Sequence, residues 1–78
     1  MHYVYILRLS DGSYYHGFSD NLRQRIHYHQ HGAVSQTKKF LPAALVFYAA
    51  FASKRKAIAF EKYLKASSGF AFRNKRLV

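Results

Sequence analysis

Two short runs of alternating aromatic and aliphatic residues, separated by an Asp-Gly pair, constrain the fold of this chain more than any other feature. Residues 3–9 alternate with the two-residue period of a β-strand, and a second run covers residues 13–18. The Asp-Gly pair between them is a strong signal for a tight turn. The sequence therefore predicts an antiparallel hairpin in which Tyr5 and Tyr15 stand near the same end.

The rest of the chain predicts further elements from its periodicity and boundary residues. In chain order these are a helix capped by Ser19 or Asp20 and stopped by Gly32, a basic loop over 32–42, a buried strand over 45–51, a helix over 54–66 capped by Ser53, and a short helix over 71–77. The order ββαβαα predicts an α+β fold, in which helices flank a small three-stranded antiparallel sheet. We expect one domain spanning residues 1–78.

Charge is the strongest bulk property of the sequence. Thirteen Lys and Arg face three acidic residues, for a formal net charge of +10 over 78 residues. This imbalance indicates a polyanionic partner, with nucleic acid first and an anionic membrane surface second. Side chains expected to contact nucleic acid come from the basic stretches, the first helix and the hairpin: His16, Arg23, Lys38, Lys39, Arg73 and Lys75.

Composition also excludes several classes of protein. The chain has no cysteine, which rules out disulfides and thiolate metal sites. No apolar run approaches the roughly 18 residues that a membrane span needs, and the basic helices offer too narrow an apolar face for surface binding. The N-terminus enters a strand pattern at once, so we expect no signal peptide and a cytoplasmic location.

The only glutamate of the chain falls on the apolar stripe of the second predicted helix. At 100° per residue, Glu61 lies near the centre of an arc of apolar residues: Ala57, Ile58, Phe60 and Leu64. A carboxylate there is costly unless it is paired or binds a metal. Two interpretations stay open. Glu61 either forms a buried ion pair with a neighbouring Lys or Arg, or it binds Mg²⁺, which needs only one or two protein carboxylates.

The first predicted helix carries a cation beside its apolar stripe. Leu22 and Ile26 form the stripe, and Arg25 and His29, four residues apart, lie next to it. Arg25 is therefore expected to point toward the sheet, where its planar fork suits a phosphate; the alternative is a surface Arg whose stem covers apolar area. His29 is a candidate general acid or base, or a phosphate contact. A metal site built from three helix histidines is rejected, because residues two apart splay on a helix.

The tyrosines are ambiguous by themselves, because an aromatic side chain at a strand position usually serves packing. Beside an arginine and a metal, the phenol of Tyr5 or Tyr15 can position or deprotonate a water molecule. That role requires its ordinary pKa of about 10 to be lowered by the cation and the guanidinium.

The residues Tyr3-Val4-Tyr5 and Tyr15-His16-Gly17 resemble the two motifs of the GIY-YIG nuclease domain, and the chain is similar to its small stand-alone members. On this resemblance the residues of the family's site correspond to Tyr5, Tyr15, Arg25, His29 and the metal-binding Glu61. The sequence departs from the family where Tyr3 replaces a glycine and where Phe18 and Phe70 stand in place of polar residues. A family asparagine has no secure counterpart.

The resemblance implies a metal-dependent endonuclease that hydrolyses phosphodiester bonds in DNA, with Mg²⁺ or Mn²⁺ on Glu61. One small domain leaves no second domain to recognise a base sequence. We therefore expect selectivity for branched or single-stranded regions, or a protein partner that supplies specificity. Phe18 and Phe70 favour an alternative, a catalytically weak nucleic-acid-binding module of the same fold. A third interpretation is a small RNA- or ribosome-associated protein.

Overall fold

The computed structural model describes residues 1–66, and within them it contains every element predicted up to that point. The elements are β1 (His2–Arg8), β2 (Tyr14–Ser19), α1 (Leu22–Gln30), the 3₁₀ turn η1 (Lys38–Phe40), β3 (Ala44–Phe51) and α2 (Lys54–Lys65). The helix predicted over 71–77 lies outside the described residues, as do Phe70, Arg73 and Lys75.

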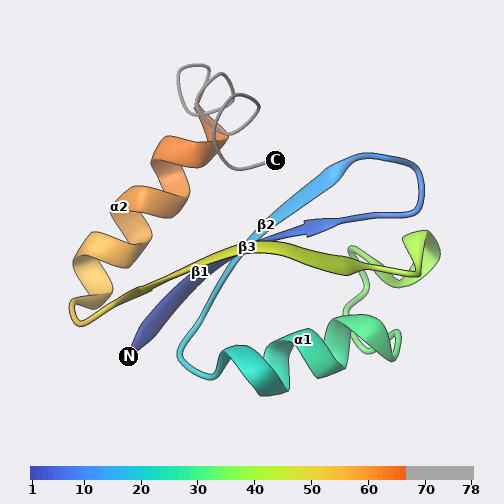
Figure 1. Cartoon of the computed structure of the whole chain (residues 1–78), viewed down its shortest axis with the longest axis horizontal. Coiled ribbons are helices and arrows are strands. Elements are labelled where there is room, and N and C mark those ends of the chain that lie inside the picture. Colours follow the sequence, from blue (N-terminus) through green and yellow to red (C-terminus); the bar gives the residue numbers. More distant parts are fainter. Residues whose placement is uncertain (67–78) are drawn as a thin grey trace.

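The three strands form one antiparallel sheet in the order β2-β1-β3, which confirms the predicted fold class. Figure 1 shows α1 and α2 on opposite sides of this sheet. The central strand β1 is therefore covered on both faces, and four consecutive side chains in it are fully buried: Val4, Tyr5, Ile6 and Leu7. A small chain gains two hydrophobic layers from a single strand in this way.

The alternation along β1 sends its side chains into two separate clusters. Val4 and Ile6 pack with Ala57 and Leu64 of α2. Tyr5 and Leu7 pack on the other face, where Leu22, Ile26 and Leu41 cover them. Fully burying one aliphatic side chain of this size stabilises a fold by about 1.5–3 kcal/mol. The two-residue period thus fixes which β1 side chains belong to the face that carries the tyrosine hydroxyls.

Both helices begin at side-chain caps, although one prediction was wrong by a residue. Asn21, rather than Ser19 or Asp20, caps α1 by accepting from the amide of Gln24 at 3.2 Å. Ser19 instead accepts from the Asn21 amide at 3.0 Å and orders the approach to the helix. Ser53 caps α2 as predicted. Among residues 1–66, no helix is long and apolar enough to span a membrane.

The strand β3 is not buried as the sequence suggested. It lies at the edge of the sheet, and Leu45, Val46 and Tyr48 are 38%, 37% and 55% exposed. Its pairing with β1 shifts by one residue at Val46, so that Ile6 faces Phe47 while Leu7 faces Leu45. An apolar run alone does not distinguish an edge strand from a central one, which explains the error.

Gly17 of β2 lies directly opposite Tyr5, and the tyrosine ring lies across it. A Cβ atom at position 17 would overlap Cζ and the hydroxyl oxygen of Tyr5. Glycine in a strand interior often marks such a close approach. The position of the Tyr5 hydroxyl therefore depends on the missing side chain at Gly17.

We predict that Gly17→Ala lowers the free energy of unfolding by about 1–3 kcal/mol, the usual cost of overpacking. Urea denaturation measures this loss. In a Tyr5→Leu background, where no ring covers position 17, the same substitution should cost much less, because the two residues are coupled. An equal cost in both backgrounds would show that the ring contact is not the cause.

Candidate active site around two tyrosines

Two tyrosines and one histidine form an aromatic group on the α1 face of the sheet, joining β1, β2 and α1. The rings of Tyr5 and Tyr15 stack with centroids 6.4 Å apart and planes 21° from parallel. The ring of His29 meets both edge-on, at 5.6 Å from Tyr5 and 5.0 Å from Tyr15. We call these three residues and Arg25 the tyrosine cluster. The structure thus brings together four of the five catalytic candidates.

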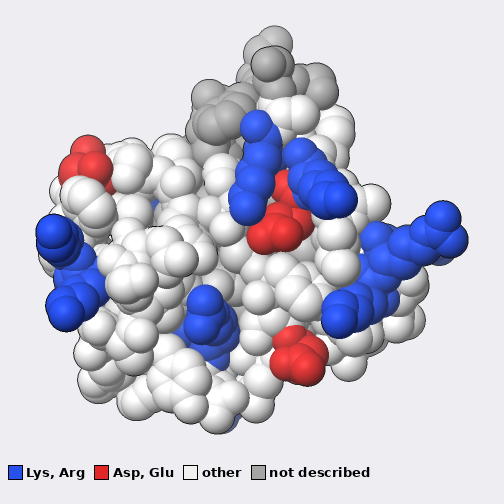
Figure 2. All heavy atoms as spheres, turned by 180° about the vertical axis from the view of Figure 1, so that it is seen from behind, with Lys and Arg blue, Asp and Glu red and all other residues white. Residues whose placement is uncertain are grey.

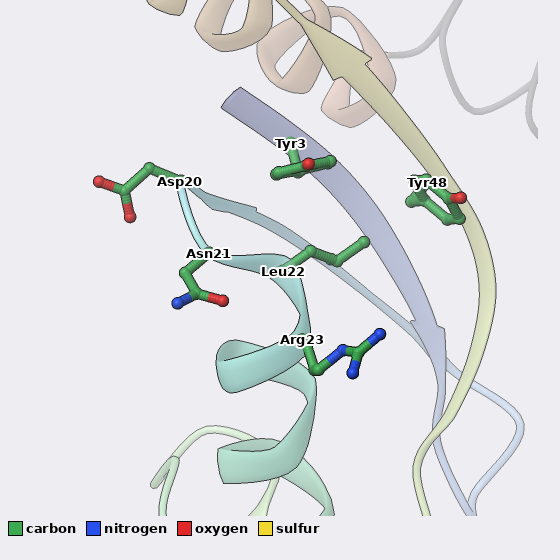
Figure 3. Close-up of a pocket in the computed structure, with 6 residues that line it drawn as sticks. All are labelled: Tyr3, Asp20, Asn21, Leu22, Arg23 and Tyr48. Carbon is green, nitrogen blue, oxygen red and sulfur yellow. The ribbon is translucent and has the colours of Figure 1, made fainter. Parts of the chain in front are cut away.

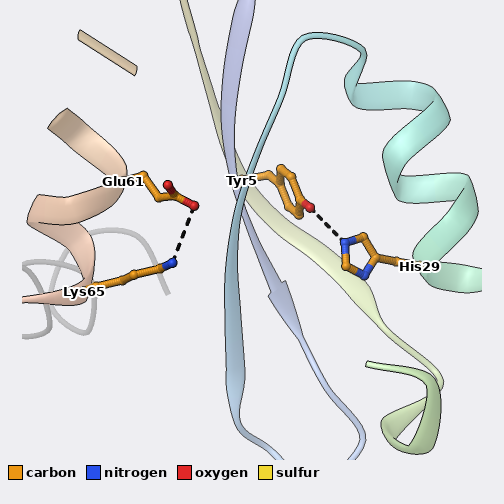
Figure 4. Close-up of polar contacts among 4 residues, drawn as sticks. All are labelled: Tyr5, His29, Glu61 and Lys65. Carbon is orange, nitrogen blue, oxygen red and sulfur yellow. Dashed lines mark hydrogen bonds and ion pairs between the residues drawn. The ribbon is translucent and has the colours of Figure 1, made fainter. Parts of the chain in front are cut away.

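His29 holds the tyrosine cluster in place through hydrogen bonds at both ring nitrogens. Its Nε2 lies 2.8 Å from the Tyr5 hydroxyl, as Figure 4 shows, and its Nδ1 lies 2.8 Å from Oγ1 of Thr37. The side chains of Tyr5, His29 and Thr37 are fully buried. Buried polar groups that are fully paired hold their neighbours in one geometry, because leaving one unpaired is costly.

The direction of these hydrogen bonds follows from what each group can donate. The Thr37 hydroxyl donates to the carbonyl oxygen of Val34, so it can only accept from Nδ1 of His29, and the O–H of Tyr5 donates to the unprotonated Nε2. His29 then carries its proton on Nδ1 and donates to Thr37. The Thr37 hydroxyl in turn lies 3.5 Å from the carbonyl oxygen of Val34 and donates to it.

Burial sets the protonation states of the tyrosine cluster. It lowers the pKa of His29 from 6.5 to about 4, and the positive charge of Arg25 contributes to this shift. Burial also raises the pKa of Tyr5, outweighing the hydrogen bond from Arg25, which lowers it. Hydrogen bonding to Tyr5 raises the pKa of Arg25. At neutral pH Tyr5 and His29 are therefore neutral and Arg25 is a permanent cation, whereas a phenol that deprotonates water was expected to require a lowered pKa.

Glu61 approaches from the other face of the sheet. Figure 4 shows its carboxylate on the α2 side of the strands and the Tyr5 hydroxyl on the α1 side. Its side chain is 19% exposed and lies 3.5 Å from the Nζ of Lys65, one turn later on α2. The charge of Glu61 still contributes, as the smallest cause, to the raised pKa of Tyr5. Because β2 is an edge strand, a ligand beyond this edge can reach groups from both faces.

The residues around Glu61 suit a hard divalent cation only if the ion keeps most of its other ligands as water or substrate oxygen. No group of three or more His, Cys, Asp or Glu that could hold a metal occurs within residues 1–66. Mg²⁺ is commonly bound through one or two carboxylates with waters and phosphate oxygens completing the shell. A single half-buried carboxylate such as Glu61 fits that pattern.

The predicted nucleic-acid contacts fall in different places. Arg23, Lys38 and Lys39 are exposed, on α1 and η1. His16 is only 9% exposed and points from β2 to the α2 face, opposite Ile6. Figure 2 shows Lys and Arg side chains spread over one face of the molecule rather than gathered in one patch, with acidic side chains near several of them.

Sequence reasoning missed the part that Thr37 plays. The residue falls within the basic loop predicted over residues 32–42, yet its buried hydroxyl contacts His29. A threonine in a polar loop has no periodicity that marks it as buried. The available hint was its place in the loop that follows the helix carrying His29.

Comparison with known proteins finds a matching family and similar proteins. A model of the GIY-YIG catalytic domain matches residues 1–75. A UPF0213 protein of Streptococcus pneumoniae is 39% identical over 64 residues, which cover 81% of this chain and 65% of that protein. A UPF0213 protein of Limosilactobacillus reuteri is 39% identical over 67 residues, covering 82% of this chain and 70% of that one. The chain thus spans about two thirds of the length of these relatives.

A solved structure shows the same fold. The solution NMR structure of a UPF0213 protein from Bacillus halodurans superimposes with a TM-score of 0.61 at 36% sequence identity. The match covers 97% of this chain and 83% of that one. The arrangement of sheet and helices is therefore shared with a protein of known structure.

We predict that Thr37→Val lowers the free energy of unfolding by about 1–3 kcal/mol, because it leaves the buried Nδ1–H of His29 without an acceptor. Thr37→Ser should retain most of the stability. The ring N–H signal of His29 in ¹⁵N NMR spectra reports the tautomer directly. It should be protected in the parent and in Thr37→Ser but not in Thr37→Val; an unchanged Nδ1–H signal in the valine variant would contradict the assignment.

The lowered pKa of His29 predicts how stability depends on pH. Between its ordinary 6.5 and its folded value of about 4, the unfolded chain takes up a proton that the folded chain does not. The contribution of His29 to stability is therefore full above pH 6.5 and is lost as the pH falls toward 4. Chemical denaturation between pH 6.5 and 4 should show that the free energy of unfolding falls less steeply with pH in His29→Gln than in the parent. The control His27→Gln, at an exposed position of α1, should show the same pH dependence as the parent.

Proposed function

The chain belongs to the GIY-YIG family, and on that premise we propose that it is a metal-dependent endonuclease hydrolysing phosphodiester bonds in DNA. One observation carries the proposal: the hydroxyl of Tyr5 is hydrogen-bonded to the buried, neutral imidazole of His29 and lies beside the cationic side chain of Arg25. A buried phenol used only for packing needs one hydrogen-bond partner, and does not need a cation beside its oxygen as well.

Arg25 is proposed to bind the phosphate that is cut. Its side chain is partly buried, its guanidinium lies beside Tyr5 and Tyr15, and its raised pKa keeps it charged at every physiological pH. Hydrogen-bond donors fixed in place before the reaction stabilise charge that develops on phosphate oxygens, because no reorganisation is needed at that moment. The fork of Arg25 has donors beyond the one that holds Tyr5.

The proton of the attacking water is proposed to leave through Tyr5 and His29. Tyr5 has a raised pKa and does not ionise in advance, so its oxygen takes the water proton while its own proton passes to Nε2 of His29. Thr37 keeps Nε2 free to accept by binding the proton on Nδ1. The new P–O bond forms from the water oxygen, and the bond to the 3′ oxygen breaks.

Glu61 is proposed to hold Mg²⁺ or Mn²⁺ together with substrate oxygens. A divalent cation bound there would supply Lewis acidity to the leaving oxygen. Glu61 itself would have to exchange its contact with Lys65 for that cation, which is a modest cost for a surface ion pair.

The same ion pair supports a second candidate function, a nucleic-acid-binding module without turnover. If the contact at 3.5 Å between Glu61 and Lys65 is the only task of the carboxylate, the basic chain still binds polyanions but does not cut them. The two functions differ in what the carboxylate does once Lys65 is removed.

We predict that Glu61→Gln lowers the rate of plasmid nicking in Mn²⁺ on the order of a hundredfold, because Lewis-acid stabilisation is worth several kcal/mol. Lys65→Ala is the matched control, since it removes the ion pair and keeps the carboxylate. It should nick at least as fast as the parent. Addition of EDTA should abolish nicking by both the parent and Lys65→Ala.

Equal activity of Glu61→Gln and the parent would refute the metal role. Absence of nicking by the parent on plasmid and on branched DNA, with DNA binding retained, would favour the binding module. Thermal denaturation of each variant separates loss of activity from loss of fold.

A further inference from the structure

A groove runs along the flank of α1 opposite the tyrosine cluster. Two adjoining hollows of about 300 and 430 Å³ lie between α1 and β3 and share Leu22, Arg23 and Tyr48 as lining residues. We call them together the α1–β3 groove. It exists because β3 is an edge strand whose α1 face is left uncovered, with Leu45 and Tyr48 exposed on it.

The floor of the α1–β3 groove is aromatic and its wall is cationic. Tyr48 is 55% exposed, and its ring centroid lies 6.4 Å from that of Tyr3 on the next strand. Figure 3 shows the Arg23 side chain extending from α1 into the space beside Tyr48, while the carboxylate of Asp20 points away from it. The charge that faces the groove is therefore positive.

Helical geometry places the groove and the tyrosine cluster on two sides of one helix. At 100° per residue, Leu22 and Ile26 face the sheet, with Arg25 and His29 on one flank and Arg23 on the other. Both sites open on the same face of the sheet, and α1 stands between them.

We propose that the α1–β3 groove binds a single-stranded arm of the nucleic-acid substrate, with a base stacked on Tyr48 and a neighbouring phosphate on Arg23. The proposal rests on the function proposed above and names the shape of its substrate. An exposed aromatic side chain beside a cation is the combination that binds single strands without reading sequence, because every base has a π-face and every link a phosphate.

Charge decides between this occupant and the other candidates. A second copy of the chain would bring together two proteins that each carry a net charge of +10, which opposes self-association through this face. An apolar peptide would cover Tyr48 and Leu45 but would leave Arg23 without a partner. A nucleotide strand can stack a base on the tyrosine rings and place a phosphate beside Arg23.

A substrate that occupies both sites must pass its two strands on opposite flanks of α1. One strand presents its phosphate to Arg25, and the other leaves along Tyr48. Fully paired duplex does not separate its strands in this way, whereas a fork or a flap does. The helix thereby selects branched nucleic acid without contacting any base edge.

Binding of fluorescent DNA in EDTA tests the groove separately from cleavage. We compare a blunt duplex with the same duplex carrying a single-stranded arm. Tyr48→Ala should weaken binding of the armed duplex about tenfold, the scale of one lost stacking contact, and leave the blunt duplex unchanged. Tyr28→Ala is the matched control, because Tyr28 is 42% exposed on α1 outside the groove and should change neither.

Salt dependence tests the phosphate contact. Arg23→Ala should lower the slope of log affinity against log salt concentration by about one for the armed duplex only. Arg55→Ala, an exposed arginine on α2, controls for loss of one positive charge. Far-UV circular dichroism confirms that each variant is folded.

Three results would overturn the proposal. In the first, Tyr48→Ala binds the armed duplex as the parent does. In the second, it weakens the blunt duplex equally. In the third, analytical ultracentrifugation finds a dimer that Tyr48→Ala dissociates, which would make the groove a contact between copies. If the parent cuts no DNA but Tyr48→Ala still loses the arm preference, the nuclease function fails and the groove stands.

Discussion

The complete burial of β1 on both faces is the constraint on which the other features depend. A strand without a solvent face must place every side chain in one of two cores, and Tyr5 brings a hydroxyl into one of them. A buried hydroxyl without partners is costly, so the fold has to supply them. His29 and Arg25 answer that requirement from α1. The burial of Tyr5 therefore determines both the packing of this face and which groups stand beside the hydroxyl in the proposed chemistry.

The same burial explains why the proposed proton path uses neutral groups. Removing water around Tyr5 and His29 disfavours their charged forms, which leaves Arg25 as the single permanent charge of the tyrosine cluster. A phosphate that enters the tyrosine cluster meets this cation, while the carboxylate of Glu61 lies on the other face of the sheet (Figure 4). Glu61 lies on the α2 side of the strands, where it is paired with Lys65 (Figure 4).

The sequence predicts those features that local patterns determine. The hairpin follows from the period of two, and the cap at Ser53 follows from the residue itself. Prediction from the sequence fails where a property depends on parts of the chain that are distant in sequence. The apolar run of β3 is typical of a buried strand, although no helix within residues 1–66 covers its α1 face, and the sequence places the hydroxyl of Thr37 in a solvated loop. The apolar arc predicted for the second helix includes Glu61, whose side chain is indeed largely buried. The arc could not show that the Nζ of Lys65 lies 3.5 Å from the Glu61 carboxylate.

The contact between Gly17 and Tyr5 has a consequence for how such a chain can diversify. Gly17 cannot gain a side chain at low cost while Tyr5 is present, since its Cβ atom would occupy the volume of the Tyr5 ring. Mutational paths through this pair must therefore pass a less stable intermediate or shrink the ring first. Grafting this tyrosine onto another hairpin would place its hydroxyl in the same position only if a glycine were grafted opposite it.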